Sequence, residues 1–202
     1  MNDAIYRKMY RVFEDQNGYA ETKDLTASGV HTTHIKQLEE TGSIFKLKRG
    51  LYRLSNYDLG PHEKLIDASK TVPNGIICLH SALSYHELIT SQSRQYNVAL
   101  HRNDTKIRLP EDSPIKLLYF SDRQYHEGID HIDMNGHRVK IYDKEKTLCD
   151  SARYQNKIGK DIVKEGFKTY LEKPYREIEK LLMYAEQTRV KSIVSNYVDM
   201  LS

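Results

Sequence analysis

The sequence has little of several features that would place it in a specialised class of protein. It has only two cysteines, Cys78 and Cys149, which are too few for a disulfide framework. No apolar run approaches the roughly 20 residues of a membrane-spanning helix, and the N-terminal stretch MNDAIYRKMYRVF lacks the apolar segment and cleavage site of a signal peptide. Fixed-period repeats and low-complexity segments are also missing. We therefore expect a folded cytoplasmic protein with free thiols and no membrane partner.

The chain also lacks a strong charge of one sign. Its 31 Lys and Arg residues against 28 Asp and Glu residues give a net charge of only +3. Any affinity for nucleic acid must then come from local clustering of basic side chains. With 202 residues and 39% hydrophobic content, the chain can form one large domain or two small ones.

Apolar residues at helical spacing predict three helices at the start of the chain. The first is expected over residues 3–16 and ends at Asn17-Gly18. A second, short helix is expected over 22–27 with Thr22 as its N-cap, and a third over 32–41. The residues expected to face inward are Ile5, Met9, Val12, Phe13, Ile35 and Leu38.

From residue 44 the hydrophobic period changes from 3.6 to 2, in the stretch IFKLKRGLYRL (44–54). The Lys-Arg-Gly triplet predicts a tight turn between two strands. We expect four apolar residues to hold this hairpin against the helices: Phe45, Leu47, Tyr52 and Leu54. Its basic residues are Lys46, Lys48, Arg49 and Arg53, with no acidic residue among them. Such a cluster fits two roles, either keeping an edge hairpin soluble or contacting phosphates.

Three helices with a short second connection, followed by a basic hairpin, are the element order of a winged helix-turn-helix. There the third helix enters the major groove and the hairpin lies against the adjacent backbone. Glu39 and Glu40 would repel phosphate, so we expect the end of the third helix to point out of the groove. The alternative is a solvated helix beside an ordinary edge hairpin. The residues expected to contact DNA are Thr32, Thr33, Lys36, Gln37, Lys46, Lys48, Arg49 and Arg53, with Thr33 and Gln37 as base-reading candidates.

This N-terminal segment resembles a known family of regulators. The residues that carry the resemblance are Gly18-Tyr19, Leu25, Gly29-Val30, Ile35, Leu38, Gly42, Ile44 and RGLYRL (49–54). They are similar in type and spacing to the N-terminal winged helix of the AbiEi family. Members of that family are antitoxins and transcriptional regulators of type IV toxin–antitoxin systems, which act in abortive infection.

The second half is expected to form a mixed α/β domain. A linking helix is predicted over 61–71, and the turn chemistry of Asn135-Gly136 predicts a hairpin. We therefore expect an α+β protein with a winged helix-turn-helix DNA-binding domain over 1–58 and an antitoxin-type domain over 59–202. The predicted strands cover 76–79, 96–100, 115–120, 131–134 and 138–142. Three helices follow, with inward faces near Ile162, Leu181 and Val194 and with Thr188 as a cap of the last.

Two stretches of this second half are similar to the C-terminal region of the same family. They are CLHSALSYHEL (78–88) and IYDKEKTLCD (141–150), the latter followed by Arg153. The resemblance implies an autoregulator that binds operator repeats in the promoter of its own operon. It also implies that the C-terminal domain counteracts a nucleotidyltransferase-like toxin, with or without a stable complex. Self-association on DNA and the role of the last three helices are left open.

An acidic cluster in the second half permits an enzymatic alternative. Asp143, Glu145 and Lys146 are the residue types of a metal-dependent nuclease, which would make the chain a nucleic-acid-processing enzyme. The nuclease signature places its lysine two positions after an acidic residue, and neither acid here has one at that spacing. Asp143 or Lys144 can instead cap the following helix, with Glu145 favoured by the helix dipole.

The remaining polar residues of this half favour structural roles. Asp150 and Arg153 lie three apart and are expected to pair on a helix surface. Cys78, His80 and His86 lack the spacing of a zinc site. No glycine-rich phosphate loop or nucleophile elbow is present. We therefore expect a regulator with no catalytic residues, no metal and no cofactor.

Overall fold

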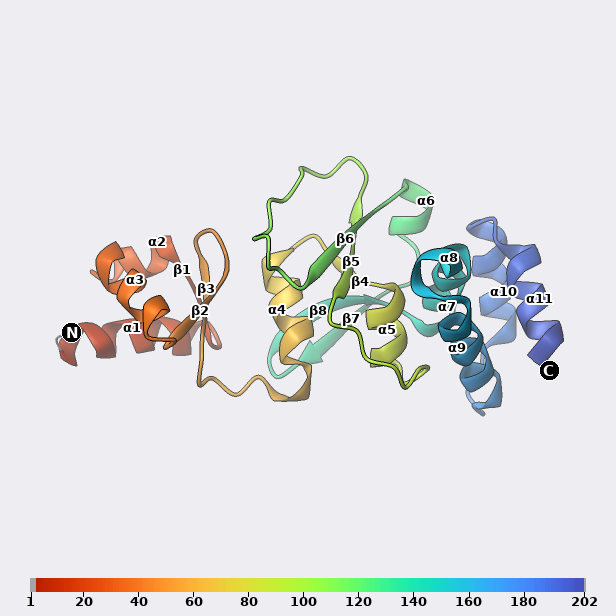
Figure 1. The fold of residues 1–202 in the computed structure, drawn as a ribbon, viewed down its shortest axis with the longest axis horizontal. Helices are drawn as coiled ribbons and strands as arrows, with labels where there is room; N and C mark the ends of the chain where they lie inside the picture. Colours follow the sequence, from red (N-terminus) through yellow and green to blue (C-terminus); the bar gives the residue numbers. More distant parts are fainter. Residues whose placement is uncertain (1–2, 202) are drawn as a thin grey trace. The chain divides into compact units, whose positions relative to one another are not determined.

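The change of hydrophobic period at residue 44 marks the passage from helices to strands in the structure. The structure is a computed structural model, and it describes residues 3–201 (Figure 1). The N-terminal elements are α1 (Asp3–Asp15), β1 (Tyr19–Glu21), α2 (Thr22–Ala27), α3 (Thr32–Glu40), β2 (Ile44–Lys48) and β3 (Leu51–Leu54). The three predicted helices are confirmed to within a residue. The N-cap of α2 is Glu21, and Thr22, the predicted cap, is the first residue of the helix.

The inward faces of these helices form one core. Met9 and Phe13 of α1 are fully buried, and Ile35 and Leu38 of α3 pack against them with at most 3% of each exposed. The burial of this apolar stripe explains why three short helices of modest propensity are stable together. The same core continues into the strands through Ile44, Tyr52 and Leu54.

The first sheet has three strands in the order β1-β3-β2. The sequence predicts only the hairpin, and β1 was missed because three residues are too few to show a period of two. Tyr19 pairs with Arg53 and Glu21 with Leu51, so β1 is antiparallel to β3. The central position of β3 explains why all four of its residues are buried.

The hairpin faces differ from the prediction by one residue. Ile44, Lys46 and Tyr52 share the face that meets the helices, because Ile44 pairs with Leu54 and Lys46 with Tyr52. Phe45 is on the opposite face and is 47% exposed, so its predicted role as an anchor is wrong. A shift of one residue moves every side chain of a strand to the other face, and a register shift between Lys46 and Lys48 hides the true alternation.

The elements of the second half alternate between strands and helices. A short turn of 3-10 helix (Gly60–His62) leads into α4 (Glu63–Thr71), which matches the predicted linking helix. The elements that follow are β4 (Ile76–Ile77), α5 (Leu79–Tyr85), β5 (Tyr96–His101), β6 (Ile115–Phe120), α6 (Asp122–Tyr125), β7 (Ile129–Met134), β8 (His137–Tyr142), α7 (Lys144–Arg153), α8 (Gln155–Ile158), α9 (Lys160–Glu172), α10 (Ile178–Gln187) and α11 (Lys191–Leu201). The mixed α+β class is thereby confirmed.

The second sheet has five strands in the order β6-β5-β4-β8-β7. It is mixed, since β4 is antiparallel to β5 and parallel to β8, while β5 and β6 are parallel. Asn135 and Gly136 join β7 to β8 with φ angles of 49° and 78°, the positive values that a type I′ turn requires. The predicted hairpin is confirmed.

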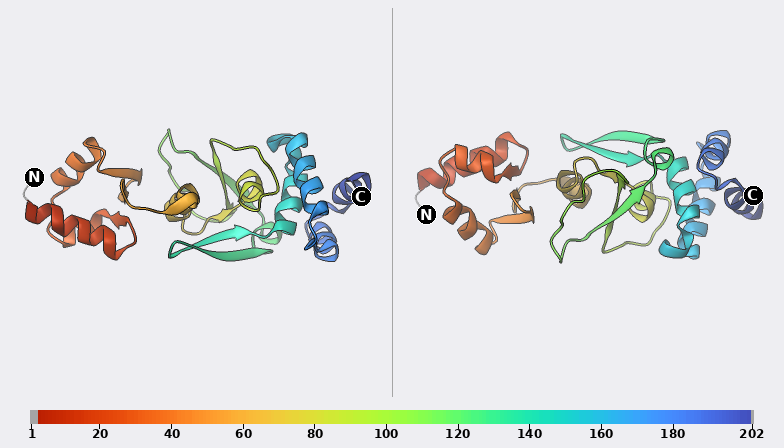
Figure 2. Two further views of the ribbon diagram at one scale, coloured as in Figure 1. Left: turned by 90° about the horizontal axis from the view of Figure 1, so that it is seen from below. Right: turned by 90° about the horizontal axis from the view of Figure 1, so that it is seen from above.

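The last helices gather at one end of this sheet, as both views of Figure 2 show in blue. Leu148 of α7, Phe167 of α9, Leu181 of α10 and Val194 of α11 are all fully buried in one apolar cluster. Thr188 is not a cap of α11. It ends α10 instead, where its hydroxyl donates to the carbonyl oxygen of Tyr184. Cys78 and Cys149 are buried free thiols, as predicted.

The chain divides into two compact units. One runs up to Thr71 and takes in Lys106–Ser113 and Asp133–Arg138. The other consists of Val72–Thr105, Pro114–Ile132 and the chain from Val139 onward. The first unit thus continues past residue 58 through α4. Across residues 3–201, no helix is both long enough and apolar enough to cross a membrane.

Candidate nucleic-acid interface

Helix α3 presents one polar face to solvent. Thr32, Thr33, Lys36 and Gln37 are exposed, while Ile35 and Leu38 on the other side belong to the core. The helix has only nine residues, so its position depends on this buried stripe rather than on its own stability. A short polar helix fixed by its apolar side is suited to place hydroxyl, amide and ammonium groups against another molecule.

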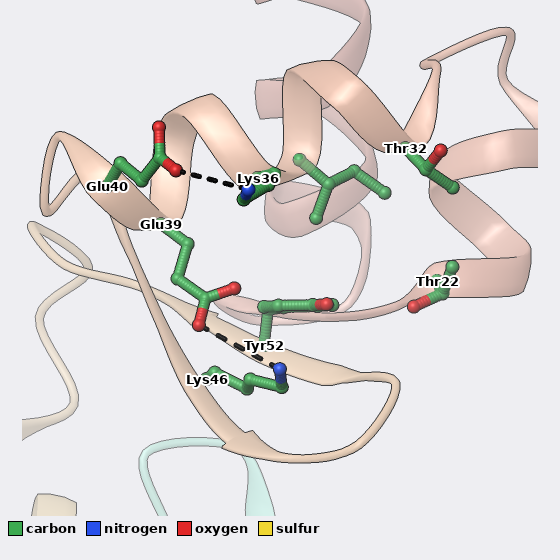
Figure 3. Close-up of a pocket in the computed structure, with 8 residues that line it drawn as sticks. Thr22, Thr32, Lys36, Glu39, Glu40, Lys46 and Tyr52 are labelled. Carbon is green, nitrogen blue, oxygen red and sulfur yellow. Dashed lines mark ion pairs between the residues drawn. The ribbon is translucent and has the colours of Figure 1, made fainter.

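A hollow of about 490 Å³ lies between α3 and the β2–β3 hairpin (Figure 3). Tyr52, which sequence reasoning treated only as an anchor, forms part of its wall. Thr22 from the start of α2 completes its edge, and the sequence had indicated only a capping role for that residue. The lining residues are Thr22, Thr32, Ile35, Lys36, Glu39, Glu40, Lys46 and Tyr52. The structure thus brings Thr32, Lys36 and Lys46 together.

The charges around this hollow are balanced. Lys46 Nζ lies 3.9 Å from Glu39 Oε1, and Lys36 Nζ lies 3.7 Å from Glu40 Oε1. Glu39 does not point away from the hairpin, because Figure 3 shows its carboxylate directed toward Lys46. Both pairs are longer than a hydrogen bond and partly exposed, so each contributes at most about 1 kcal/mol.

The hairpin turn carries two further basic residues with different surroundings. Arg49 is exposed at the turn, next to Gly50, whose φ of 82° is unfavourable for other residues. Lys48 is half-buried, and its amino group donates to the carbonyl oxygen of Thr71 at 2.8 Å. Arg49 therefore offers a free charge to solvent, whereas that of Lys48 is already engaged.

The position of Arg53 differs from the one expected from the sequence. It was expected as an exposed phosphate contact, but only 6% of the residue is exposed. Its guanidinium lies 3.0 Å from Glu63 and 3.2 Å from Asp67, both on α4, and stacks over the Phe45 ring at 5.1 Å. The side chain is neutralised inside the fold because β3 is the central strand, so it stabilises the unit instead of facing a partner.

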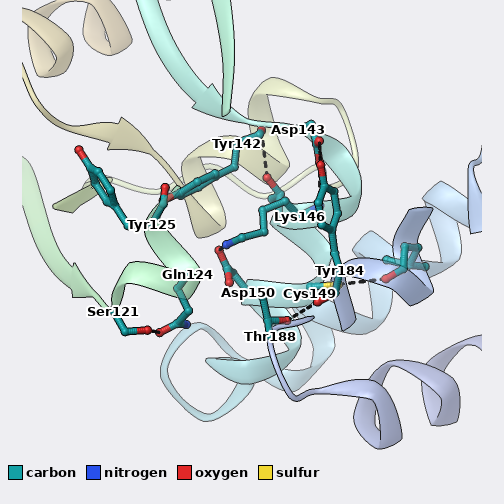
Figure 4. A network of polar contacts seen from close by, with 12 residues as sticks. Ser121, Gln124, Tyr125, Tyr142, Asp143, Lys146, Cys149, Asp150, Tyr184 and Thr188 are labelled. Carbon is teal, nitrogen blue, oxygen red and sulfur yellow. Dashed lines mark hydrogen bonds and ion pairs between the residues drawn. The ribbon is translucent and has the colours of Figure 1, made fainter. Parts of the chain in front are cut away.

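The acidic stretch before and within α7 forms a buried polar network (Figure 4). Asp143 caps α7, since its Oδ1 accepts from the backbone N–H of Lys146 at 2.8 Å. Its other oxygen accepts from the hydroxyl of Tyr184 at 3.0 Å and lies 3.2 Å from Lys180. The predicted capping role of Asp143 is confirmed.

Glu145 is held by the same neighbouring helices. Tyr170 donates to its Oε1 at 2.6 Å, and Lys180 lies 3.2 Å from its Oε2. Burial alone would lower the pKa of Lys180, but the carboxylates of Asp143 and Glu145 raise it well above the usual value. Lys180 therefore stays charged, and α10 is clamped onto the start of α7. Sequence reasoning missed this clamp because its partners lie far along the chain.

Lys146 forms a buried ion pair with Asp150, one helical turn further on. The expected surface pair of Asp150 with Arg153 is therefore wrong, since both Lys146 and Asp150 are inaccessible to solvent. The Lys146 amino group also lies 4.3 Å from the centre of the Tyr142 ring. Burial raises the pKa of Asp150, and the Lys146 charge opposes that shift. A lysine enclosed in this way cannot reach a nucleic-acid substrate as the nuclease alternative requires.

The histidines of the second unit are also engaged by the protein. His86 Nε2 donates to the carbonyl oxygen of Tyr142 at 2.7 Å, and His80 Nε2 lies 3.1 Å from the Ser91 hydroxyl. One group that sequence reasoning did not consider, His101, Asp122 and His126, comes within metal-binding range. His101 is nevertheless saturated, because its Nε2 lies 2.7 Å from Asp122 and its Nδ1 accepts from the N–H of Asn103.

Comparison with solved structures relates the whole fold to a known protein. The chain is similar to the structure titled "Crystal structure of RV2827C protein from Mycobacterium tuberculosis", with a TM-score of 0.59 and 13% sequence identity. The match covers 96% of this chain and 78% of the other. At this identity the likeness concerns the fold alone. No curated protein matches the sequence.

Comparison with protein families concerns the N-terminal segment. Residues 7–55 match the family model described as "Transcriptional regulator, AbiEi antitoxin". This range runs from α1 to the end of the β2–β3 hairpin and includes the hollow of Figure 3. The resemblance predicted from the sequence is confirmed for this segment, since residues 7–55 are similar to the AbiEi family of antitoxins and transcriptional regulators.

Proposed function

We propose that this protein is a cytoplasmic, DNA-binding transcriptional regulator that acts as the antitoxin of a type IV toxin–antitoxin system. The observation that carries the proposal is the family match over residues 7–55, which coincides with a polar α3 beside a basic hairpin. In this proposal α1 to α3 are the helix-turn-helix and β2–β3 is the wing. Helix α3 enters the major groove of double-stranded operator DNA, and the wing lies against the backbone.

The proposed contacts follow from exposure and chemistry. Thr33 and Gln37 on the exposed face of α3 read base edges, and Thr32 and Lys36 accompany them. Lys46 and Arg49 on the wing meet phosphates, with Lys48 joining them if DNA displaces the carbonyl oxygen of Thr71. Arg53 is left out because its charge is neutralised by Glu63 and Asp67.

The second half carries the antitoxin part of the proposal. Its domain, from residue 59 onward, counteracts a nucleotidyltransferase-like toxin without requiring a stable complex, and the protein associates with a second copy on operator repeats. This part is supported by the similarity of CLHSALSYHEL and IYDKEKTLCD to the family. In the second of these stretches, Asp143 and Glu145 belong to a buried hydrogen-bond network, which supports a structural role for that stretch within the domain.

The DNA-binding part is tested by removing wing charges. Replacing Lys46 and Arg49 together by Ala should weaken binding to operator and random DNA alike. It should also reduce the slope of log K against log salt by about 0.9 for each lost phosphate contact. Fluorescence anisotropy over a salt titration measures both effects. Replacing Lys164 and Lys168 together by Ala, which removes the same two charges from the exposed side of α9, is the matched control.

Replacement of Thr33 or Gln37 tests the base-reading role separately. Each change should weaken binding to the operator by more than binding to random DNA, since a base contact discriminates by roughly 1–3 kcal/mol. An equal loss on both DNAs argues against base reading. An unchanged affinity and salt slope for the Lys46 and Arg49 double variant rejects the wing.

The antitoxin part is tested in cells. Expression of the toxin encoded beside this gene should stop growth, and co-expression of the full chain should restore it. The Lys46 and Arg49 double variant should lose repression of its promoter while still restoring growth. Failure of the wild-type protein to restore growth rejects the antitoxin role and leaves DNA binding untouched.

A further inference from the structure

The hollow between α3 and the wing contains acids that phosphate binding does not explain. A site made only for phosphates would be basic, yet Glu39 and Glu40 match Lys36 and Lys46 in number. Two carboxylates beside the phosphate backbone weaken binding to every sequence. Their presence therefore indicates a contact in which a negatively charged acceptor is favourable.

Glu39 is the acid placed to make such a contact. Its carboxylate projects from α3 into the space beside the wing, next to Tyr52 (Figure 3). Its side chain is 37% exposed, and its only ion-pair partner among residues 3–201 is Lys46, at 3.9 Å. The pair is too long for a hydrogen bond, so both carboxylate oxygens keep their capacity to accept. Glu40 is more exposed and pairs with Lys36 along the helix.

We infer that Glu39 reads a cytosine in the operator by accepting a hydrogen bond from its 4-amino group. This inference rests on the proposed entry of α3 into the major groove. Cytosine presents only an amino donor there, whereas adenine adds the N7 acceptor beside its amino group. Guanine presents two acceptors and thymine one, and acceptors repel a carboxylate. Lys46 neutralises Glu39 in the free protein and meets the neighbouring phosphate in the complex. Glu39 thus weakens binding to most sequences and favours those with cytosine at one position.

Selection of binding sites from a random duplex pool tests this inference. The wild-type protein should select a site with one cytosine that the Glu39→Gln variant no longer prefers. The amide of that variant can both donate and accept, so its preference should move toward adenine at this position alone. The variant should also bind random DNA roughly twofold to tenfold more tightly, because a repulsive charge is lost.

A single-atom change in the DNA gives the sharper measurement. Replacing the selected cytosine by 2-pyrimidinone, which lacks only the 4-amino group, should weaken wild-type binding about 5- to 150-fold. The same replacement should leave the Glu39→Ala variant unchanged. Glu40→Gln is the matched control, since it removes an equal charge from the next residue. It should tighten binding to random DNA but select the wild-type site.

The outcomes separate this inference from the proposed function. If Glu39→Gln selects the wild-type site with the same preference at every position, the role of Glu39 is overturned and DNA binding stands. If Glu39→Gln weakens binding to all DNA equally, the role of Glu39 is only to position Lys46. That result also overturns the inference that Glu39 reads a base. If the wild-type protein binds no duplex even at low salt, the inference and the proposed function both fail.

Discussion

A lysine pairs with a carboxylate both at the hollow beside α3 and at the start of α7, but the two pairs differ in burial. At the hollow, Lys46 and Glu39 are partly exposed and 3.9 Å apart. At α7, Lys146 and Asp150 are inaccessible to solvent and in direct contact. Both pairs join one lysine to one acid of the same unit. Their burial differs completely, and burial decides how strongly each charge depends on its partner.

The difference in burial indicates which of these charged residues can contact another molecule. An exposed, loosely held pair can exchange its partner for a phosphate or a base at little cost in stability. A buried pair cannot, because separating the two charges leaves one of them without water or counter-charge. The EKTLCD stretch, which looked like an acidic catalytic cluster, therefore serves the fold, while the less conspicuous Lys46 and Glu39 are available for recognition.

The largest loss of stability is expected when one member of the buried pair is removed. Lys146→Met should destabilise the protein by about 3–5 kcal/mol, since Asp150 is left buried and unpaired. Urea unfolding followed by circular dichroism measures this loss. Lys46→Met, the matched change at the hollow, should stay within about 0.5 kcal/mol of the wild type. The double variant Lys146→Met with Asp150→Leu should recover much of the loss. Equal losses of stability in Lys146→Met and Lys46→Met would show that burial does not distinguish the two pairs.

A loss of stability is also expected when Arg53, a buried charge of the first unit, is replaced. Arg53→Met should cost about 2–3 kcal/mol, because Glu63 and Asp67 lose their shared partner. The loss should be smaller than for Lys146, as both acids are partly exposed. Burial already raises the pKa of Asp67 in spite of the Arg53 charge, so the variant should raise it further. Carbon-detected NMR titration of the Asp67 carboxyl measures that shift. An unaltered stability would show that the guanidinium is dispensable.

The elements of the first unit could be predicted because their signals are local. The predicted bounds of α1, α2 and α3 differ from the observed ones by at most one residue, because each helix ends at its own turn signal. Helix α4 begins two residues later than predicted. The hairpin was located but its faces were not, because a register shift interrupts the alternation between Lys46 and Lys48. Phe45 and Lys46 consequently exchanged their expected sides.

The partners of buried charges could not be predicted in the same way. Glu145 meets Tyr170, which is 25 residues away, and Asp143 meets Tyr184, which is 41 residues away. Such pairings depend on how α9 and α10 pack on α7, and no periodicity records that packing. The burial of Arg53 has a similar origin, since it depends on β1, a strand too short to recognise. The exposed residues of α3 were found because one buried stripe fixes both faces of a helix.

A smaller effect is expected where a hydroxyl joins the buried network. Tyr184→Phe removes the donor to Asp143 and should cost about 1–2 kcal/mol, because a buried carboxylate loses one of its hydrogen bonds. Lys180 still lies 3.2 Å from that carboxylate, so the charge keeps a partner. Tyr119→Phe, a change on the exposed side of β6, is the control. Thermal unfolding of both variants gives the difference, and a similar result for both would mean that Lys180 and the Lys146 backbone N–H hold Asp143 without Tyr184.

The smallest effect is a dependence of stability on pH through His86. Burial lowers the pKa of His86, and the bond to the Tyr142 carbonyl oxygen only partly offsets this. The unfolded chain, with an ordinary pKa of about 6.5, therefore binds more protons than the folded chain as the pH falls below that value. The contribution of neutral His86 is complete above about pH 6.5 and declines on acidification.

Urea unfolding at pH 7.5 and 5.5 isolates this contribution when the wild type is compared with His86→Gln. Glutamine keeps a donor for Tyr142 but does not titrate, so the variant should lose less stability on acidification than the wild type. Equal pH dependence of the wild type and the variant would show that folding leaves the pKa of His86 unshifted and that its burial does not disfavour the charged form.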